Sequence, residues 1–190
     1  MLPGLSARGD LIGNPALGIV EALRALAERL VETLVEPGAI LVLYGELFGG
    51  KVSGASKQYT GERRVGYRLF DAARIGGYSS LLELPQAEIS SWREAGGQPF
   101  VAEAELQRLA AACELELTPR LFTLADSELP RTIEQAFALL RERLPRTLCG
   151  LDETAGGQPE GIVLRAQDRS QIAKLRFEDY ERTLRRRKSR

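Results

Sequence analysis

The 190-residue chain contains no histidine. Histidine is the side chain that most often transfers protons near neutral pH, and it is a common zinc ligand. Its absence excludes histidine-based catalytic triads and histidine acid–base catalysis, and it argues against a zinc site. Cysteine is also scarce. Cys113 and Cys149 are far apart, have no CxxC spacing and provide no disulfide framework.

Long apolar runs and an excess of one charge are missing as well. No run of about 18 apolar residues is present to span a membrane, and no basic and apolar leader opens the chain. We therefore expect a cytoplasmic location and no membrane partner. Lys and Arg together number 26, as do Asp and Glu, so the formal net charge is zero. Bulk charge thus does not predict nucleic-acid binding.

Any basic surface must then be local, and the clearest case is the C-terminal segment 181–190. We interpret this segment as a solvated basic tail, with a contact to RNA phosphates as the alternative. Its cationic residues are Arg182, Arg185, Arg186, Arg187, Lys188 and Arg190.

The remaining composition is that of an ordinary globular protein, with 44% apolar and 27% charged residues. We expect an α+β fold with mainly antiparallel strands, forming one domain over residues 1–180. Helices are predicted from Asn14-Pro15 to Pro37-Gly38, twice between about 86 and 114 with a short extended segment at 99–101 between them, from Thr132 to Pro145, and over about 178–188. Thr132 and Gln135 have the spacing of a capping box at the start of the helix 132–145. Strands are predicted at about 39–48, 65–75, 160–167 and 171–177, with an extended segment at 118–124 and a hairpin turn at 167–170.

Four short segments combine apolar residues with one or two charged or aromatic ones: 44–50, 67–71, 160–165 and 173–177. In a strand, residues two apart share a face. Lys174 and Arg176 are therefore expected to project together, on the face opposite Leu175. Phe70 is expected to share a face with Gly66 and Arg68.

In this order, the four segments resemble the nucleotidyltransferase motifs of the RNA ligase family, which belongs to the covalent nucleotidyltransferase superfamily. Tyr44-Gly45-Glu46 is similar to the third motif, and 67–71 to the aromatic strand after it. Residues 160–163 are similar to the fourth motif and 174–176 to the fifth. The resemblance covers about residues 6–180. It implies a ligase adenylylation-domain fold, with a nucleotide cleft in the sheets and helices packed outside.

The first motif of that family, Lys-x-Asp-Gly, is absent. In the family its lysine attacks the α-phosphate of ATP and holds AMP covalently. The lysines of this chain are Lys51, Lys57, Lys174 and Lys188, and none is followed by x-Asp-Gly. The resemblance thus implies an N-terminally truncated domain, which starts just downstream of the nucleophile. Arg8-Gly9 is similar to the segment that follows the nucleophile.

The resemblance also implies roles for individual residues. Glu46 would hydrogen-bond the ribose hydroxyls of ATP, and Phe70 would stack on adenine. Glu160 would help to hold Mg²⁺ or Mn²⁺, hard cations that prefer oxygen ligands. Lys174 and Arg176 would be the catalytic cations at the phosphates.

Two positions depart from the family pattern or carry weaker expectations. Arg176 stands where the family commonly has a second lysine. Arginine keeps the charge but changes the geometry and the capacity for proton transfer. Arg8 would contact phosphate or the RNA end.

Three functional hypotheses follow. The first is an ATP-dependent RNA ligase domain that joins RNA ends through an adenylylated intermediate, inactive in self-adenylylation without the lysine. Its partners would be ATP and nicked or broken RNA, with DNA ends as the alternative substrate. The second hypothesis is a noncovalent nucleotide- or RNA-binding protein, a pseudo-ligase. The third is a structural or RNA-binding protein that uses the basic tail.

Overall fold

The computed structural model describes residues 6–7, 10–11, 19–34, 37–50 and 56–188. It is an α+β protein whose strands pair two by two: β1 with β2, β3 with β4, and β5 with β6. The chain forms two compact units. The first unit comprises residues 1–47 and 67–117, and the second comprises 48–66 and 118–190. The chain crosses between the units three times, because each unit is built from two separate segments.

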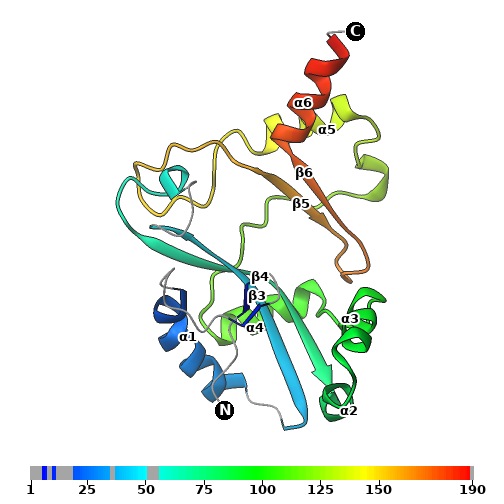
Figure 1. Cartoon of the computed structure of the whole chain (residues 1–190). Helices are drawn as coiled ribbons and strands as arrows, with labels where there is room; N and C mark the ends of the chain where they lie inside the picture. Colours follow the sequence, from blue (N-terminus) through cyan, green and yellow to red (C-terminus); the bar gives the residue numbers. More distant parts are fainter. Residues whose placement is uncertain (1–5, 8–9, 12–18, 35–36, 51–55, 189–190) are drawn as a thin grey trace. The chain divides into compact units, whose positions relative to one another are not determined.

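The first unit contains the short antiparallel pair β1 (Ser6–Ala7) and β2 (Asp10–Leu11), followed by the helix α1 (Ile19–Leu34). Most of β3 (Ala39–Gly49) and of β4 (Val65–Gly76) also belongs to it (Figure 1). The remaining helices are α2 (Tyr78–Leu82), α3 (Gln86–Glu94) and α4 (Glu103–Ala112). The start predicted for α1, at Asn14-Pro15, lies outside the described residues.

The core of the first unit forms where β4 meets α4. Leu69 and Leu106 are fully buried there, and Ala72, Val101, Leu109 and Ala110 complete the cluster. The predicted extended segment at 99–101 is confirmed, because Phe100 forms an isolated bridge with Ala73 and the Val101 N–H donates to the Ala72 carbonyl. On β4, exposed Phe70 lies between buried Leu69 and buried Asp71, as alternation predicted, but Ala72 and Ala73 are both buried.

The second unit contains the short 3-10 helices η2 (Ser56–Gln58) and η3 (Asp126–Glu128) and the helix α5 (Ile133–Arg143). The antiparallel hairpin of β5 (Gly161–Arg165) and β6 (Ile172–Arg176) leads directly into α6 (Phe177–Lys188), as Figure 1 shows in orange and red. Residues 181–188 of the predicted basic tail therefore form part of α6.

Local sequence signals explain how the second unit is built. α5 begins at the predicted capping box, in which the Gln135 N–H donates to Thr132 Oγ1 and the Gln135 side chain accepts from the Thr132 N–H. One face of the hairpin packs on α5, in a core made of Leu140, Leu144, Ile162 and Leu175. One element differs from the expectations: the short helix α2 was not predicted.

Candidate functional site

The exposed face of the β5–β6 hairpin carries one carboxylate and two cations, which we call the Glu160 cluster. Lys174 Nζ donates a hydrogen bond to Glu160 Oε1 at 3.1 Å, and Arg176 Nε lies 3.7 Å from the same oxygen. All three side chains are exposed to solvent. Alternation along β6 puts both cations on the face opposite buried Leu175, as predicted. Glu160 immediately precedes β5, and its carbonyl accepts from the Phe177 N–H.

Two exposed apolar side chains border this cluster. Val163 pairs with Lys174 across the hairpin and is 52% exposed, and Ile172 pairs with Arg165 and is 54% exposed. The sequence analysis missed both, although the period of two along 161–165 already places Val163 opposite buried Ile162. An apolar surface beside two cations suits a ligand with a flat apolar part and an anionic part.

The Glu160 cluster is arranged to exchange its internal ion pairs for contacts with an anion. Exposed ion pairs contribute only about 0–1 kcal/mol, so their replacement costs little. With two cations and one carboxylate, the cluster has a net positive charge. Lysine presents a compact charge and arginine a planar fork that can hold two oxygens at once. These are properties of a phosphate site.

The Tyr44-Gly45-Glu46 segment lies on β3 in the first unit, where Glu46 is exposed. A Cβ atom on residue 45 would overlap the hydroxyl oxygen and ring of Tyr67 on β4. Glycine is therefore required at this position for the close approach of the tyrosine. Burial raises the pKa of the Tyr67 hydroxyl above its ordinary value.

Tyr44 belongs to a group of three aromatic side chains in the first unit, together with Phe70 and Phe100. Phe70 is 41% exposed, and the centroid of the Tyr44 ring is 6.4 Å from that of Phe70 and 5.6 Å from that of Phe100. Gln98 Nε2 donates a hydrogen bond of 2.7 Å to the Tyr44 hydroxyl. Phe70 is thus a partly exposed residue of β4 and not part of the buried core, and an aromatic ring of this kind can stack on a flat base.

Three of the predicted site residues are in contact within one unit. Glu160, Lys174 and Arg176 are in contact within the second unit, whereas Glu46 and Phe70 belong to the first unit. Arg8, the sixth predicted residue, lies outside the described residues.

For a divalent metal, the described residues offer limited ligands. No group of three or more His, Cys, Asp or Glu side chains among them could hold a metal ion. Glu160 contributes one carboxylate. Mg²⁺ is commonly held by one or two carboxylates together with substrate phosphates and water. Glu160 therefore fits a magnesium ion that arrives with a phosphate ligand, and it does not form a dedicated metal cage with its described neighbours.

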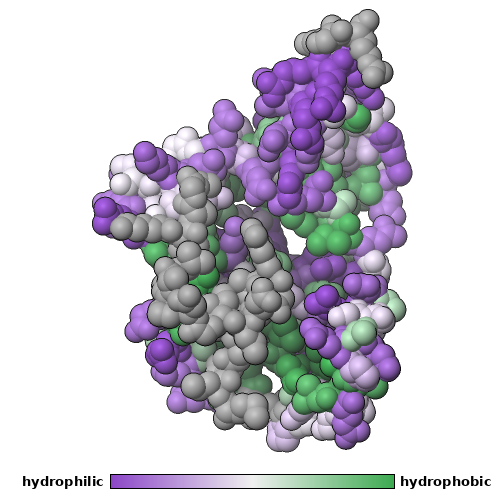
Figure 2. Space-filling model, viewed as in Figure 1, coloured by the Kyte–Doolittle hydropathy of each residue, from purple (hydrophilic) through white to green (hydrophobic). Residues whose placement is uncertain are grey.

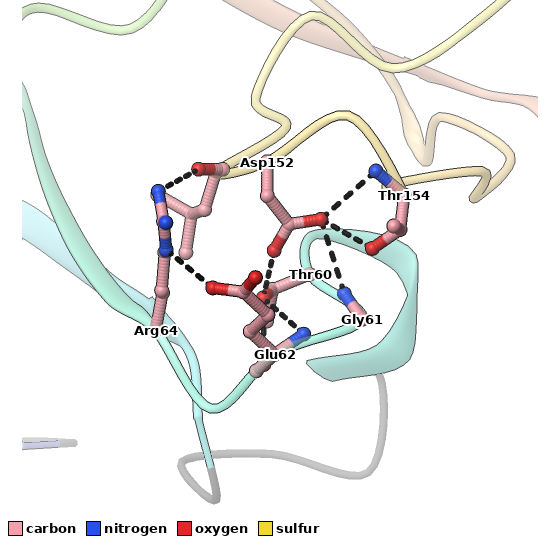
Figure 3. Close-up of polar contacts among 7 residues, drawn as sticks. Thr60, Gly61, Glu62, Arg64, Asp152 and Thr154 are labelled. Atoms are coloured by element: carbon pink, nitrogen blue, oxygen red, sulfur yellow. Dashed lines mark hydrogen bonds and ion pairs between the residues drawn. The ribbon is translucent and has the colours of Figure 1, made fainter.

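A polar network that the sequence analysis missed fixes the loop upstream of Glu160 (Figure 3). The carboxylate of Asp152 accepts hydrogen bonds from the hydroxyls of Thr60 and Thr154, from the Gly61 N–H at 3.3 Å and from the Thr154 N–H at 3.0 Å. The hydroxyl bonds, of Thr154 first and then of Thr60, lower the pKa of Asp152 well below its ordinary value. The Leu151 N–H also donates to the Tyr59 carbonyl, so the loops at 59–61 and 151–154 are joined.

Comparison with known proteins identifies the family. The model of the RNA ligase family matches residues 4–177, which is most of the chain. The chain therefore belongs to the RNA ligase family, and the prediction from its four motifs is confirmed. No curated protein and no solved structure matches it. Within the described residues, no helix is long and apolar enough to cross a membrane.

Proposed function

We propose that this chain is a nucleotide-binding part of an ATP-dependent RNA ligase, which joins RNA ends through an adenylylated intermediate. The observation that carries this proposal is the Glu160 cluster. Lys174 and Arg176 lie side by side with Glu160 on the exposed face of one hairpin. These residues belong to the segments that resemble the fourth and fifth family motifs.

The phosphates of ATP would bind at Lys174 and Arg176. Hydrogen bonds between cations and phosphate oxygens are stronger than neutral ones, because both partners are charged. As the phosphates displace Glu160 from the two cations, its carboxylate becomes free to hold Mg²⁺ or Mn²⁺. Such a metal supplies further neutralisation of the charge that develops during adenylyl transfer. The two cations orient the phosphates before reaction.

By resemblance to the family motifs, two residues of the first unit would have roles toward adenosine. Glu46 has an exposed carboxylate that would accept hydrogen bonds from both ribose hydroxyls. Phe70 has an exposed ring that would stack on adenine, and the neighbouring Tyr44 supports this ring. The hydrogen bond from Gln98 restricts the Tyr44 side chain and so contributes to the same arrangement.

A titration of ATP and Mg²⁺ into the protein, followed by calorimetry, tests this assignment. Lys174→Ala and Arg176→Ala should each weaken binding by roughly 10- to 100-fold, since a hydrogen bond to a charged group contributes about 1.5–3 kcal/mol. Lys57→Ala removes the same charge from an exposed position of η2 and should leave the affinity unchanged. Equal losses in Lys174→Ala and Lys57→Ala, or no saturable ATP binding by the wild type, would refute the assignment.

A second candidate function is noncovalent nucleotide binding by a pseudo-ligase. It is favoured by the lack of a Lys-x-Asp-Gly segment among these 190 residues. The intact mass of the chain after incubation with ATP and Mg²⁺ tests whether the chain forms a covalent adduct. An unchanged mass together with saturable binding is expected of this chain by itself. A covalent AMP adduct would show that one of its four lysines acts as the nucleophile, and peptide mapping would identify it.

A further inference from the structure

The helix α6 has one face packed on the second unit and one face turned away from it. Phe177 and Tyr180 pack against the core of that unit, and Arg187 forms an ion pair of 2.7 Å with Glu134 of α5. Positions three and four residues apart lie on the same side of a helix. The opposite face of α6 is therefore marked by three exposed residues, which we call the outer arginines: Arg182, Arg185 and Arg186.

Charge is strongly segregated along this helix. Its acidic residues lie in the first turns, and from Arg182 to the end of the chain there are six Lys and Arg residues and no Asp or Glu. Figure 2 shows hydrophilic residues over the visible side of α6. Arg182 pairs with Asp179 at 2.7 Å and Arg185 with Glu181 at 3.6 Å. Both ion pairs are exposed to solvent, and exposed ion pairs contribute little stability, so a phosphate can replace either carboxylate.

The two units have opposite charges, which the net charge of zero conceals. The second unit contains 19 Lys and Arg residues against 12 Asp and Glu, a formal charge of +7. The first unit contains 7 against 14, a formal charge of −7. A polyanion is therefore attracted to the second unit and repelled by the first.

We propose that the outer arginines of α6 form a contact surface for the phosphate backbone of single-stranded nucleic acid. The surface is distinct from the Glu160 cluster, and α6 beyond Phe177 also lies outside the segment that matches the family model. The outer arginines lie between positions 182 and 186, which are separated by about 6 Å along the helix axis. Separate arginines along an open helix face suit successive phosphates of a strand. The contact is independent of base sequence and does not require ATP.

The test compares two triple variants with the same loss of charge. The first, Arg182→Gln, Arg185→Gln and Arg186→Gln, keeps good helix formers in α6. The matched control is Arg24→Gln, Arg93→Gln and Arg108→Gln, which removes exposed arginines from helices of the first unit. Arg24 and Arg108 also form ion pairs with glutamates three residues away, as Arg182 does with Asp179. Circular dichroism checks that helix content is retained.

The measurement is the affinity for a fluorescein-labelled oligouridylate as a function of salt, followed by fluorescence anisotropy. Each phosphate contact to a single strand contributes about 0.7 to the slope of log affinity against log salt concentration. We expect the α6 variant to lower this slope by about 2, with the control variant matching the wild type. An oligothymidylate should give the same result, because the phosphates are shared. ATP affinity, measured by calorimetry, should be unchanged in both variants.

Three results would overturn the proposal: no salt-dependent binding of the oligonucleotide by the wild type, equal slopes for the two variants, or a slope that the α6 variant leaves unchanged. If the α6 variant leaves the slope unchanged, light scattering in the absence of RNA would show whether the outer arginines bind a second copy of the chain instead. If the wild type self-associates at low salt and the α6 variant does not, the outer arginines bind the acidic unit of a second copy. Failure of ATP to bind, with the expected salt slopes, would refute only the proposed nucleotide function.

Discussion

Alanine in place of Gly45 should destabilise the first unit, because Tyr67 occupies the space that the added methyl group requires. A Cβ atom at residue 45 overlaps the Tyr67 hydroxyl and ring. Tyr67 packs against the core of the first unit, so its ring has little room to withdraw. Overpacking of this kind costs about 1–3 kcal/mol. The more restricted unfolded chain offsets roughly 0.4–1 kcal/mol. Subtracting the middle of the second range, about 0.7 kcal/mol, from the middle of the first, about 2 kcal/mol, gives an expected net loss of about 1.3 kcal/mol in the free energy of unfolding.

Urea unfolding measures this loss, and Gly76→Ala is the matched control. A Cβ atom at Gly76 has no heavy atom within 4 Å, and its φ is not positive, so alanine there should be neutral or slightly stabilising. In a Tyr67→Ala background the cost of Gly45→Ala should fall close to zero, because the obstructing ring is gone. If Gly45→Ala costs the same with and without Tyr67, or behaves like Gly76→Ala, the explanation for this glycine is wrong.

Three further predictions concern the second unit. Asp152→Asn should be less stable than the wild type at pH 7. Hydrogen bonds from Thr154 and Thr60 lower the pKa of Asp152 in the folded protein, so the contribution of its carboxylate to stability fades as pH falls below about 4. Urea unfolding of the wild type and the variant at pH 7 and pH 3 checks this. A stability difference between the two proteins that does not change with pH would contradict it. Thr132→Ala removes the cap of α5 and should cost about 0.5–2 kcal/mol in thermal unfolding, whereas Thr132→Ser should cost much less. Leu140→Ala, at a fully buried position, should cost about 2–5 kcal/mol, and a loss below 1 kcal/mol would show that the site is poorly packed.

Features that depend on residues close together in the sequence could be predicted. The capping box at Thr132 and Gln135 formed as expected. Alternation placed Lys174 and Arg176 on one exposed face and Leu175 in the core. The four motifs were sufficient to predict the RNA ligase family, because each motif is a short continuous segment that can be read directly from the sequence.

The division into two units could not be predicted, because no single linker marks it. Each unit combines two separate segments, and β3 and β4 each continue from one unit into the other without a change in composition. The opposite net charges of the two units could not be predicted either, because each unit combines segments that are not adjacent in the sequence. The Asp152 network was missed because Thr60 and Asp152 are 92 residues apart, and no pattern along the chain relates them.

The central claim is that the Glu160 cluster of the second unit binds the phosphates of ATP. Amide hydrogen exchange, followed by mass spectrometry with and without ATP and Mg²⁺, tests it most directly. ATP should slow exchange in peptides that cover 160–165 and 172–176. Peptides of α4 should serve as an unaffected reference. Unchanged exchange in 160–165 and 172–176 at saturating ATP would contradict the account.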